Sequence, residues 1–178
     1  MIYPLPAVIV TCGTMERSNM LTVAWTGTLC SNPPMCYISV RPERYSYPII
    51  KERMEFTINL TTTPMARATD WVGVRSGADY DKWKETGLTP VAGEKVACPS
   101  IAESPLSIDC RVKEVMSLGS HDMFIADVVN VLAAEELIDP VSGAFDLAAA
   151  GLINYSHGQY FEQGNPLGHF GWSVKKKK

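Results

Sequence analysis

The sequence predicts a mainly β domain of the α+β class, built as an antiparallel barrel with appended short helices. Several segments alternate apolar and polar residues with period two, which is the pattern of half-buried strands. Short helical segments interrupt them without a repeating β-α-β rhythm. The chain has 178 residues, 46% of them hydrophobic and 20% charged, and shows no internal repeat or linker, so we expect one domain over residues 1–178.

The first predicted strand is the apolar run at residues 7–11, which ends at Gly13. The second, Met20–Cys30, divides by parity into an apolar face and a face of small, hydroxyl-bearing residues, because successive strand residues point to opposite sides. The apolar face holds Leu21, Val23, Trp25 and Leu29, and the other holds Thr22, Ala24, Thr26 and Thr28. A smooth hydroxyl face admits a flat ligand close to the backbone; the alternative is that the threonines face water.

The remaining elements follow the same logic. Strands are predicted at 35–41, at 56–60, around 108–112 and at 123–132, the last apolar on both faces and therefore central. A helix is predicted over Arg44–Arg53, with Ser46 near its N-cap and Pro48 in its first turn. Shorter helices are expected at 64–72 and 80–85, and a loop region at 87–105.

Charge and composition exclude several function classes. A net charge of −3 gives no basic footprint for nucleic acid, and the apolar runs are too short for a membrane span. The N-terminal residues lack a charged region and contain two prolines, so no secretory signal is expected. Five cysteines without a C-x-x-C pair predict free thiols and a cytoplasmic location, and no metal site is expected. Lys175–Lys178 are expected to be a solvated tail.

The strongest local constellation is the segment Arg41-Pro42-Glu43-Arg44-Tyr45-Ser46 at the start of a predicted helix. Free backbone N–H groups, the positive end of the helix dipole and two guanidinium groups together bind phosphate well. The alternative is a surface turn in which Arg41 or Arg44 pairs with Glu43 or Glu52. Signatures of serine hydrolases, P-loops, zinc proteases and Rossmann folds are absent from the sequence.

His121 lies in a predicted hairpin turn, Gly119–Asp122. An imidazole can donate a hydrogen bond to a substrate, but this one gains a role only where the hairpin borders a ligand site. Five further aromatic residues are expected to serve in packing: Trp25, Trp172, Tyr155, Tyr160 and Phe161. Three carboxylates in helical segments are expected to be solvated: Asp70, Asp79 and Asp81.

Three segments, in this order and spacing, resemble the flavin reductase-like, flavoredoxin-type family: Asn19–Trp25, Asn32-Pro33-Pro34 and Arg41–Ser46. In the second half, residues 119–128 are similar to the family's Gly-Asp-His hairpin and Gly-Glu-Val strand. The glycine-rich segment 164–171 is similar to its flavoredoxin branch. The likeness spans nearly the whole chain, and its strength lies in the ordered combination.

The resemblance implies a split β-barrel that binds FMN near the subunit interface of a homodimer. It implies that the isoalloxazine ring lies beside one strand and that the phosphate is held at the helix start. The ring-flanking set is Thr22, Ala24, Trp25 and Thr26, the phosphate set is Arg41, Arg44, Tyr45 and Ser46, and Asn19 completes the cofactor residues. His121 matches the hairpin histidine on the nicotinamide or acceptor side. Ser120 replaces the family's usual Asp, and Ala126-Asp127 replaces Gly-Glu; both departures bear on that role.

The function implied by the resemblance is an FMN-dependent oxidoreductase. It accepts hydride from NADH or NADPH and passes electrons to a flavin, to ferric iron or to a protein. The alternative is a non-enzymatic FMN electron carrier that works with another redox protein. In either case the flavin carries the chemistry, and no catalytic side chain is expected beyond a substrate-side role for His121.

Overall fold

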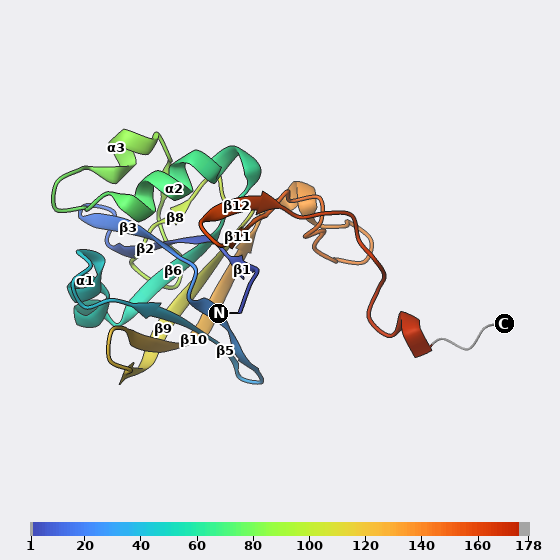
Figure 1. Ribbon diagram of the computed structural model, residues 1–178, viewed down its shortest axis with the longest axis horizontal. Helices are drawn as coiled ribbons and strands as arrows, with labels where there is room; N and C mark the ends of the chain where they lie inside the picture. The colour runs from blue at the N-terminus through green and yellow to red at the C-terminus, as the bar shows by residue number, and fades with distance from the viewer. Residues whose placement is uncertain (1, 175–178) are drawn as a thin grey trace.

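The computed structural model describes residues 2–174. Seven strands form one antiparallel sheet that curls into a barrel (Figure 1). This arrangement confirms the mainly β class and the antiparallel split barrel with appended short helices. In spatial order the strands are β3 (Ser18–Val23), β2 (Val8–Gly13), β6 (Glu55–Leu60), β9 (Leu106–Ser117), β10 (Asp122–Ala133), β5 (Pro34–Val40) and β4 (Thr26–Ser31).

The single strand predicted over Met20–Cys30 is wrong. The chain bends at Ala24 and Trp25, so that β3 pairs with β2 at one edge of the sheet and β4 pairs with β5 at the other. After the bend Thr26 is buried and Leu29 is 46% exposed, which reverses the expected faces. The alternation of residue types continues through the bend, so the sequence pattern does not reveal it.

Two apolar clusters hold the fold together. The inner cluster fills the barrel with alternate residues of the strands, among them Val10, Ile38, Phe56 and Phe124. The outer cluster joins the other face of β2 and β3 to the helices, through Ile9, Met20 and Val72 among others. Strand β2 is therefore buried on both faces. The predicted central strand is also confirmed, since β10 lies between β9 and β5.

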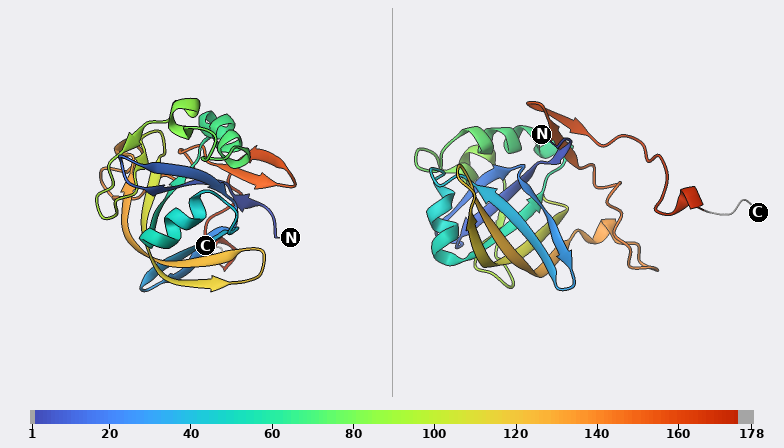
Figure 2. Two further views of the ribbon diagram at one scale, coloured as in Figure 1. Left: turned by 90° about the vertical axis from the view of Figure 1, so that its left-hand side faces the viewer. Right: turned by 60° about the horizontal axis from the view of Figure 1, so that its bottom comes forward.

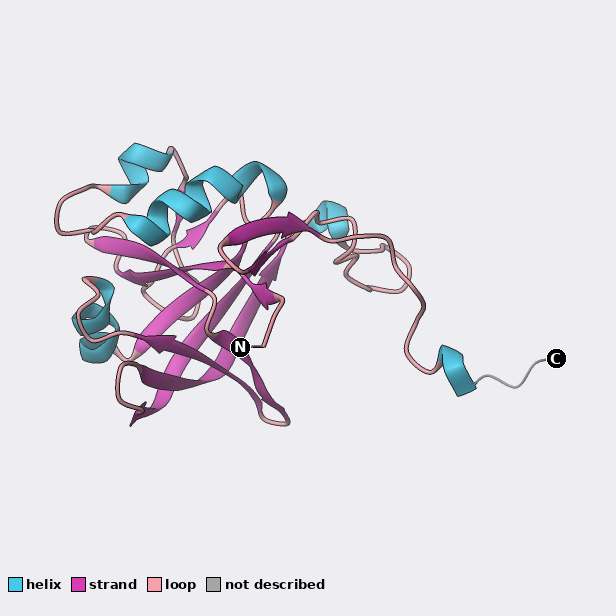
Figure 3. Cartoon of the chain, in the orientation of Figure 1, coloured by secondary structure: helices cyan, strands magenta, loops and turns pink. Residues whose placement is uncertain are grey.

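Three α-helices lie outside the sheet (Figure 3): α1 (Ser46–Arg53), α2 (Ala66–Val74) and α3 (Lys82–Thr86). A 3-10 turn, η1 (Thr63–Met65), precedes α2. The first and last residues of all three lie within two positions of the predicted bounds. Pro48 lies in the first turn of α1, as expected. Ser46 is the first helical residue and Tyr45 holds the N-cap position, so the Ser46 hydroxyl does not cap the helix; it accepts a hydrogen bond from Asn19.

A short strand near the N-terminus and a hairpin at residues 153–162 form a second, three-stranded sheet beside the barrel, called the terminal sheet here. Strand β1 (Leu5–Pro6) pairs with β11 (Ile153–Ser156), which pairs with β12 (Gln159–Glu162). The sequence pattern did not predict these strands. The predicted loop at 87–105 contains the two-residue strands β7 (Pro90–Val91) and β8 (Ser100–Ile101), and the 3-10 turn η2 (Glu135–Leu137) follows β10.

Beyond β12 the chain leaves the barrel as an extended arm, residues 163–174, which ends in the 3-10 turn η3 (Trp172–Val174) (Figures 1 and 2). Leu167 is 94% exposed and Phe170 is fully exposed. The basic tail Lys175–Lys178 lies outside the described residues. Across residues 2–174, none of the helices has the length and apolar character needed to cross a membrane.

Candidate functional site

Two adjoining cavities lie between β3, the start of α1 and α2. The smaller cavity has a volume of about 230 Å³ and the larger about 630 Å³. The larger one follows the bend after β3. It reaches the turn between β9 and β10, at Ser120 and His121, and the sheet of β1, β11 and β12. The two cavities share walls made by Leu21, Thr22, Arg41, Arg44, Gly73 and Val74.

The smaller cavity gathers cationic groups. Arg41, Arg44, Arg75 and Lys82 line it, together with the hydroxyl of Ser46. Arg41 also forms an exposed ion pair with Glu43 at 3.1 Å, so one of the alternatives foreseen for the arginines is present in the structure. Such a pair contributes little to stability and leaves the guanidinium available to a stronger anion. Arg44 instead donates to the carbonyl of Gly73 at 3.5 Å.

Lys82 is a buried cation at the base of this cavity, with 4% of its surface exposed. Its Nζ donates to the carbonyls of Met20 at 2.9 Å and Val72 at 2.8 Å. Burial, and then the nearby charge of Arg44, lower the pKa of Lys82 to about 8. A buried ammonium beside a guanidinium is electrostatically unfavourable, and an anion in the cavity offsets that cost.

The start of α1 supplies neutral donors. The Nδ2 of Asn19 donates to the Ser46 hydroxyl at 2.6 Å, which fixes both side chains at the cavity wall. The N–H of Tyr47 is already bonded to the carbonyl of Arg44. Gly77 closes over this pair, and a Cβ at that position would overlap the amide of Asn19. The loop after α2 therefore approaches β3 closely because it carries a glycine there.

The larger cavity has a smooth wall at the bend. Leu21–Trp25 line it, and Ser39 and Val40 of β5 lie beside them. The Thr22 hydroxyl donates to the Thr69 carbonyl at 2.5 Å, so it ties β3 to α2. A Cβ on Gly73 would lie 3.2 Å from the Cβ of Thr22, which shows how closely α2 packs on this strand.

All but one of the residues predicted to hold a cofactor line these two cavities. Asn19, Tyr45 and Ser46 line the smaller cavity, Ala24 and Trp25 the larger, and Thr22, Arg41 and Arg44 both. Thr26 lines neither, because β4 has left β3 at the bend. Its buried hydroxyl donates to the Tyr37 carbonyl at 2.7 Å.

A role for His121 was expected only where its hairpin borders a ligand site. In the structure, His121 lines the larger cavity. Its Nδ1 lies 2.9 Å from the Ser120 hydroxyl. The hairpin is fastened to α1 next to this residue, since Tyr47 donates to a carboxylate oxygen of Asp122 at 2.5 Å and Lys51 donates to the Tyr47 hydroxyl at 2.9 Å. The hydrogen bond from Tyr47 is the main cause of a lowered pKa of Asp122.

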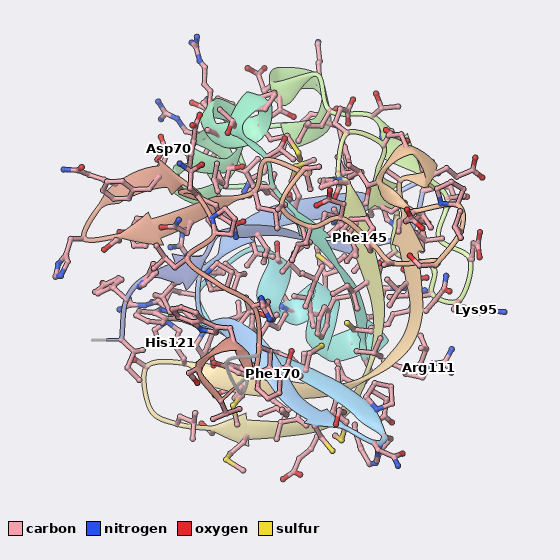
Figure 4. The ribbon with its side chains drawn as sticks, turned by 90° about the vertical axis from the view of Figure 1, so that its right-hand side faces the viewer. Asp70, Lys95, Arg111, His121, Phe145 and Phe170 are labelled. Carbon is pink, nitrogen blue, oxygen red and sulfur yellow. The ribbon has the colours of Figure 1, made fainter. Side chains whose placement is uncertain are left out.

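Sequence reasoning missed two parts of this site. Lys82 falls in a short polar helix and gives no sequence signal of burial. Asp70 is exposed to solvent, as expected, but it also lies beside the β11–β12 hairpin (Figure 4), where the Tyr160 hydroxyl donates to it at 3.3 Å. Tyr3, Tyr155 and Tyr160 join Asp70 in lining the larger cavity.

The two cavities differ in their chemistry. Cationic groups gather at one end, and a smooth wall and aromatic side chains lie at the other. Among the described residues no cluster of three His, Cys, Asp or Glu side chains could hold a metal ion.

Comparison with known proteins shows the family to which the chain is similar. The model of the flavin reductase-like domain family matches residues 1–162. The flavoredoxin of Desulfovibrio vulgaris (Miyazaki F) has a similar structure, with a TM-score of 0.90, 30% identity, and coverage of 98% of this chain and 95% of that one. An uncharacterized protein of Archaeoglobus fulgidus is 28% identical over 160 residues, which are 90% of this chain and 88% of that protein. The NADH-dependent FMN reductase RutF of Enterobacter cloacae is 22% identical over 129 residues, 70% of this chain and 73% of that protein. The matched region contains every residue that lines the two cavities.

Proposed function

The chain belongs to the flavin reductase-like domain family, and from this premise we propose that it is an FMN-dependent oxidoreductase whose electron donor is NADH or NADPH. The observation that carries the proposal is the smaller cavity, where Arg41, Arg44 and Lys82 surround a volume suited to a phosphate. The FMN reductase among its relatives supports the choice of cofactor.

The phosphate of FMN is proposed to occupy the smaller cavity. Arg41 and Arg44 contribute charge-assisted hydrogen bonds, and Ser46 contributes a hydroxyl at the start of α1. Lys82 adds a positive charge at a fixed position in the cavity wall, because hydrogen bonds to two carbonyls hold its ammonium in place. A phosphate dianion offsets the repulsion between this ammonium and Arg44.

The ring system is proposed to lie in the larger cavity against the bend. Ala24 and Trp25 line this wall, and the small side chain of Ala24 permits a flat ring to approach the backbone. Thr22 contributes by fixing α2, and Thr26 supports the bend from inside the barrel. When bound, FMN supplies hydride acceptance and onward electron transfer, and the chain's residues bind it, orient it and exclude water.

His121 is proposed to face the electron donor or acceptor. It borders the larger cavity on a hairpin that Tyr47 fastens to α1, so its position is fixed relative to the ring. Ser120 lies within hydrogen-bond distance of its Nδ1 and sets the orientation of the imidazole. In this role His121 donates a hydrogen bond to a substrate and transfers no proton of its own.

A second candidate function is an FMN electron carrier without nucleotide oxidation. The 30% identity to a flavoredoxin over nearly the whole chain favours it. Anaerobic addition of NADH or NADPH to the flavin-loaded protein separates the two functions. Loss of the flavin absorbance with either nucleotide supports the reductase, and loss only with dithionite or a reduced redox protein supports the carrier.

We also propose a homodimer. The arm exposes Leu167, Phe170 and Trp172 and points away from the barrel, so a second copy is the surface that buries these side chains. A cytoplasmic location is proposed because all five cysteines carry free thiols.

Removal of Arg44 tests the cofactor assignment. Wild-type protein should bind FMN more tightly than riboflavin, which has the same ring and no phosphate. Arg44→Ala should weaken FMN binding about 10- to 100-fold, since a hydrogen bond to a charged group contributes about 1.5–3 kcal/mol, and should leave riboflavin binding unchanged. Arg67→Ala is the matched control, because Arg67 is exposed on α2 and lines neither cavity. Equal affinities for FMN and riboflavin in wild-type protein, by calorimetry, would refute the assignment.

A further inference from the structure

The larger cavity has a second wall that the proposed cofactor does not explain. Tyr155 on β11 and Tyr160 on β12 line it, together with Tyr3, which precedes β1; this wall is separate from the bend. The rings of Tyr155 and Tyr160 pack edge-on, with centroids 5.5 Å apart, and Tyr3 and Tyr155 are 6.3 Å apart. Contacts of this kind hold aromatic rings in fixed positions, and Tyr3 is also held by the ring of His157, with centroids 4.6 Å apart. We call these three residues the tyrosine wall.

A carboxylate lies at the end of the tyrosine wall. Asp70 lies on the face of α2 that also carries Gly73 and Val74, at spacings of three and four residues, and all three line the larger cavity. Its Oδ1 accepts a hydrogen bond from the Tyr160 hydroxyl at 3.3 Å. Burial, and then Asp70, raise the pKa of Tyr160 to about 12, so this phenol stays protonated and donates to the carboxylate.

Charge is therefore distributed unequally along the larger cavity. Arg41 and Arg44 belong to the end that it shares with the smaller cavity, where the proposed phosphate neutralises them. Asp70 is the carboxylate among the residues that line the larger cavity. A ring at the tyrosine wall thus meets aromatic faces and one negative charge. Those neighbours attract a neutral or cationic ring and repel an anionic one.

We propose that the tyrosine wall and Asp70 form an acceptor subsite for planar rings that are uncharged or cationic, and that Asp70 excludes rings bearing a carboxylate or sulfonate. The inference rests on the proposed function and extends it by naming the class of small-molecule acceptor. For a quinone acceptor the balance is NAD(P)H, one proton and the quinone giving NAD(P)⁺ and the hydroquinone. Two electrons pass through the flavin, and solvent supplies the proton.

A pair of probes that differ only in charge tests the subsite: 1,4-naphthoquinone and its 2-sulfonate. Calorimetry with the FMN-loaded protein should show the neutral quinone binding at least ten times more tightly than the sulfonate. Asp70→Asn keeps the size of the side chain and removes its charge, so it should raise the affinity for the sulfonate about 10-fold and leave the neutral quinone unchanged. Asp79→Asn is the matched control, since Asp79 lies outside the larger cavity, and it should change neither affinity.

A second measurement keeps this test separate from the proposed function. The neutral quinone should also bind the flavin-free protein, and Tyr155→Ala should weaken that binding about 10-fold, whether or not the chain takes FMN. Failure of FMN binding alone would refute the cofactor assignment. Absence of quinone binding, equal affinities of both probes for the FMN-loaded protein, or equal effects of Asp70→Asn and Asp79→Asn would overturn the subsite.

Discussion

Lys82 and Arg44 place two like charges beside one small cavity, and only one of them is well hydrated. Burial removes water from the Lys82 ammonium, and its two carbonyl partners replace only part of that solvation. A ligand with two negative charges compensates for both cations together. The pair therefore favours a phosphate over a neutral group of similar size.

The titration of Lys82 predicts a pH dependence of cofactor binding. Because the pKa of Lys82 is lowered to about 8, the flavin-free protein loses this positive charge as the pH rises through that value. A bound phosphate stabilises the ammonium and raises the same pKa, so binding takes up a proton above pH 8. The affinity for FMN should fall by up to about 10-fold between roughly pH 7 and 9, because each pH unit above the pKa lowers the protonated fraction of Lys82 about 10-fold.

Riboflavin provides the control for this pH dependence, since it lacks the phosphate. Its affinity should stay level over the same range, and Lys82→Met should remove the slope for FMN. The measurement is fluorescence titration of each flavin at successive pH values. A slope of the same size for riboflavin would assign the dependence to another group.

Some residues of the site can be predicted from sequence because their signal is local. Arg41, Arg44 and Ser46 lie within six positions of one another at a helix start, and the structure does gather them. Lys82 and Asp70 give no such signal. Their partners lie 62 and 90 residues away, at Met20 and Tyr160, so their surroundings exist only after the chain has folded.

The bend at Ala24 and Trp25 is the element that creates the larger cavity. It carries the chain from one edge of the sheet to the other, and the wall between the two edges becomes the proposed binding surface. Helix α2 then covers β3 and closes the cavity from the side. The contact between them depends on Gly73 and on the hydrogen bond from Thr22 to Thr69.

Replacement of Thr22 by valine tests that contact. Valine keeps the shape of threonine and cannot donate to the Thr69 carbonyl, so the free energy of unfolding should fall by about 0.5–1.5 kcal/mol. Thr28→Val is the matched control, because Thr28 is exposed on β4, and its effect should stay within about 0.5 kcal/mol. Urea denaturation measures both variants. Equal effects would show that the hydrogen bond from Thr22 contributes nothing to stability.

Most elements could be predicted because their residue patterns repeat over five positions or more. Strands β2, β5 and β6 and helices α1 and α2 belong to this group. The bend could not, because apolar and polar residues keep alternating through it. Strand β1 is two residues long and exists only as a partner of β11, so no local pattern could reveal it.

At the scale of the whole molecule, the arm is the part of residues 2–174 that carries the most exposed apolar side chains. The exposed fractions are 94% for Leu167 and 58% for Trp172, which leaves apolar surface in water. Burial in a second copy would recover about 25 cal/mol per Å² of that surface. Exchange of identical segments between two copies also gives closed, two-fold symmetry.

A chain that ends at Glu162 tests whether the arm forms part of the dimer interface. The full chain should be a dimer by light scattering, and the shortened chain should be a monomer or a dimer with about 100-fold weaker association. Removal of residues 175–178 alone is the control and should leave the dimer intact. A shortened chain that associates as tightly as the full one would show that the arm is not part of the interface.

The pairing of Leu5 with Tyr155 sets an order of events during protein synthesis. The tyrosine wall needs Tyr3 and residues of β11 and β12, so it cannot form until the chain has been synthesised through Tyr160. A nascent chain can present the arginine pair early but lacks the side of the pocket that β11 and β12 supply.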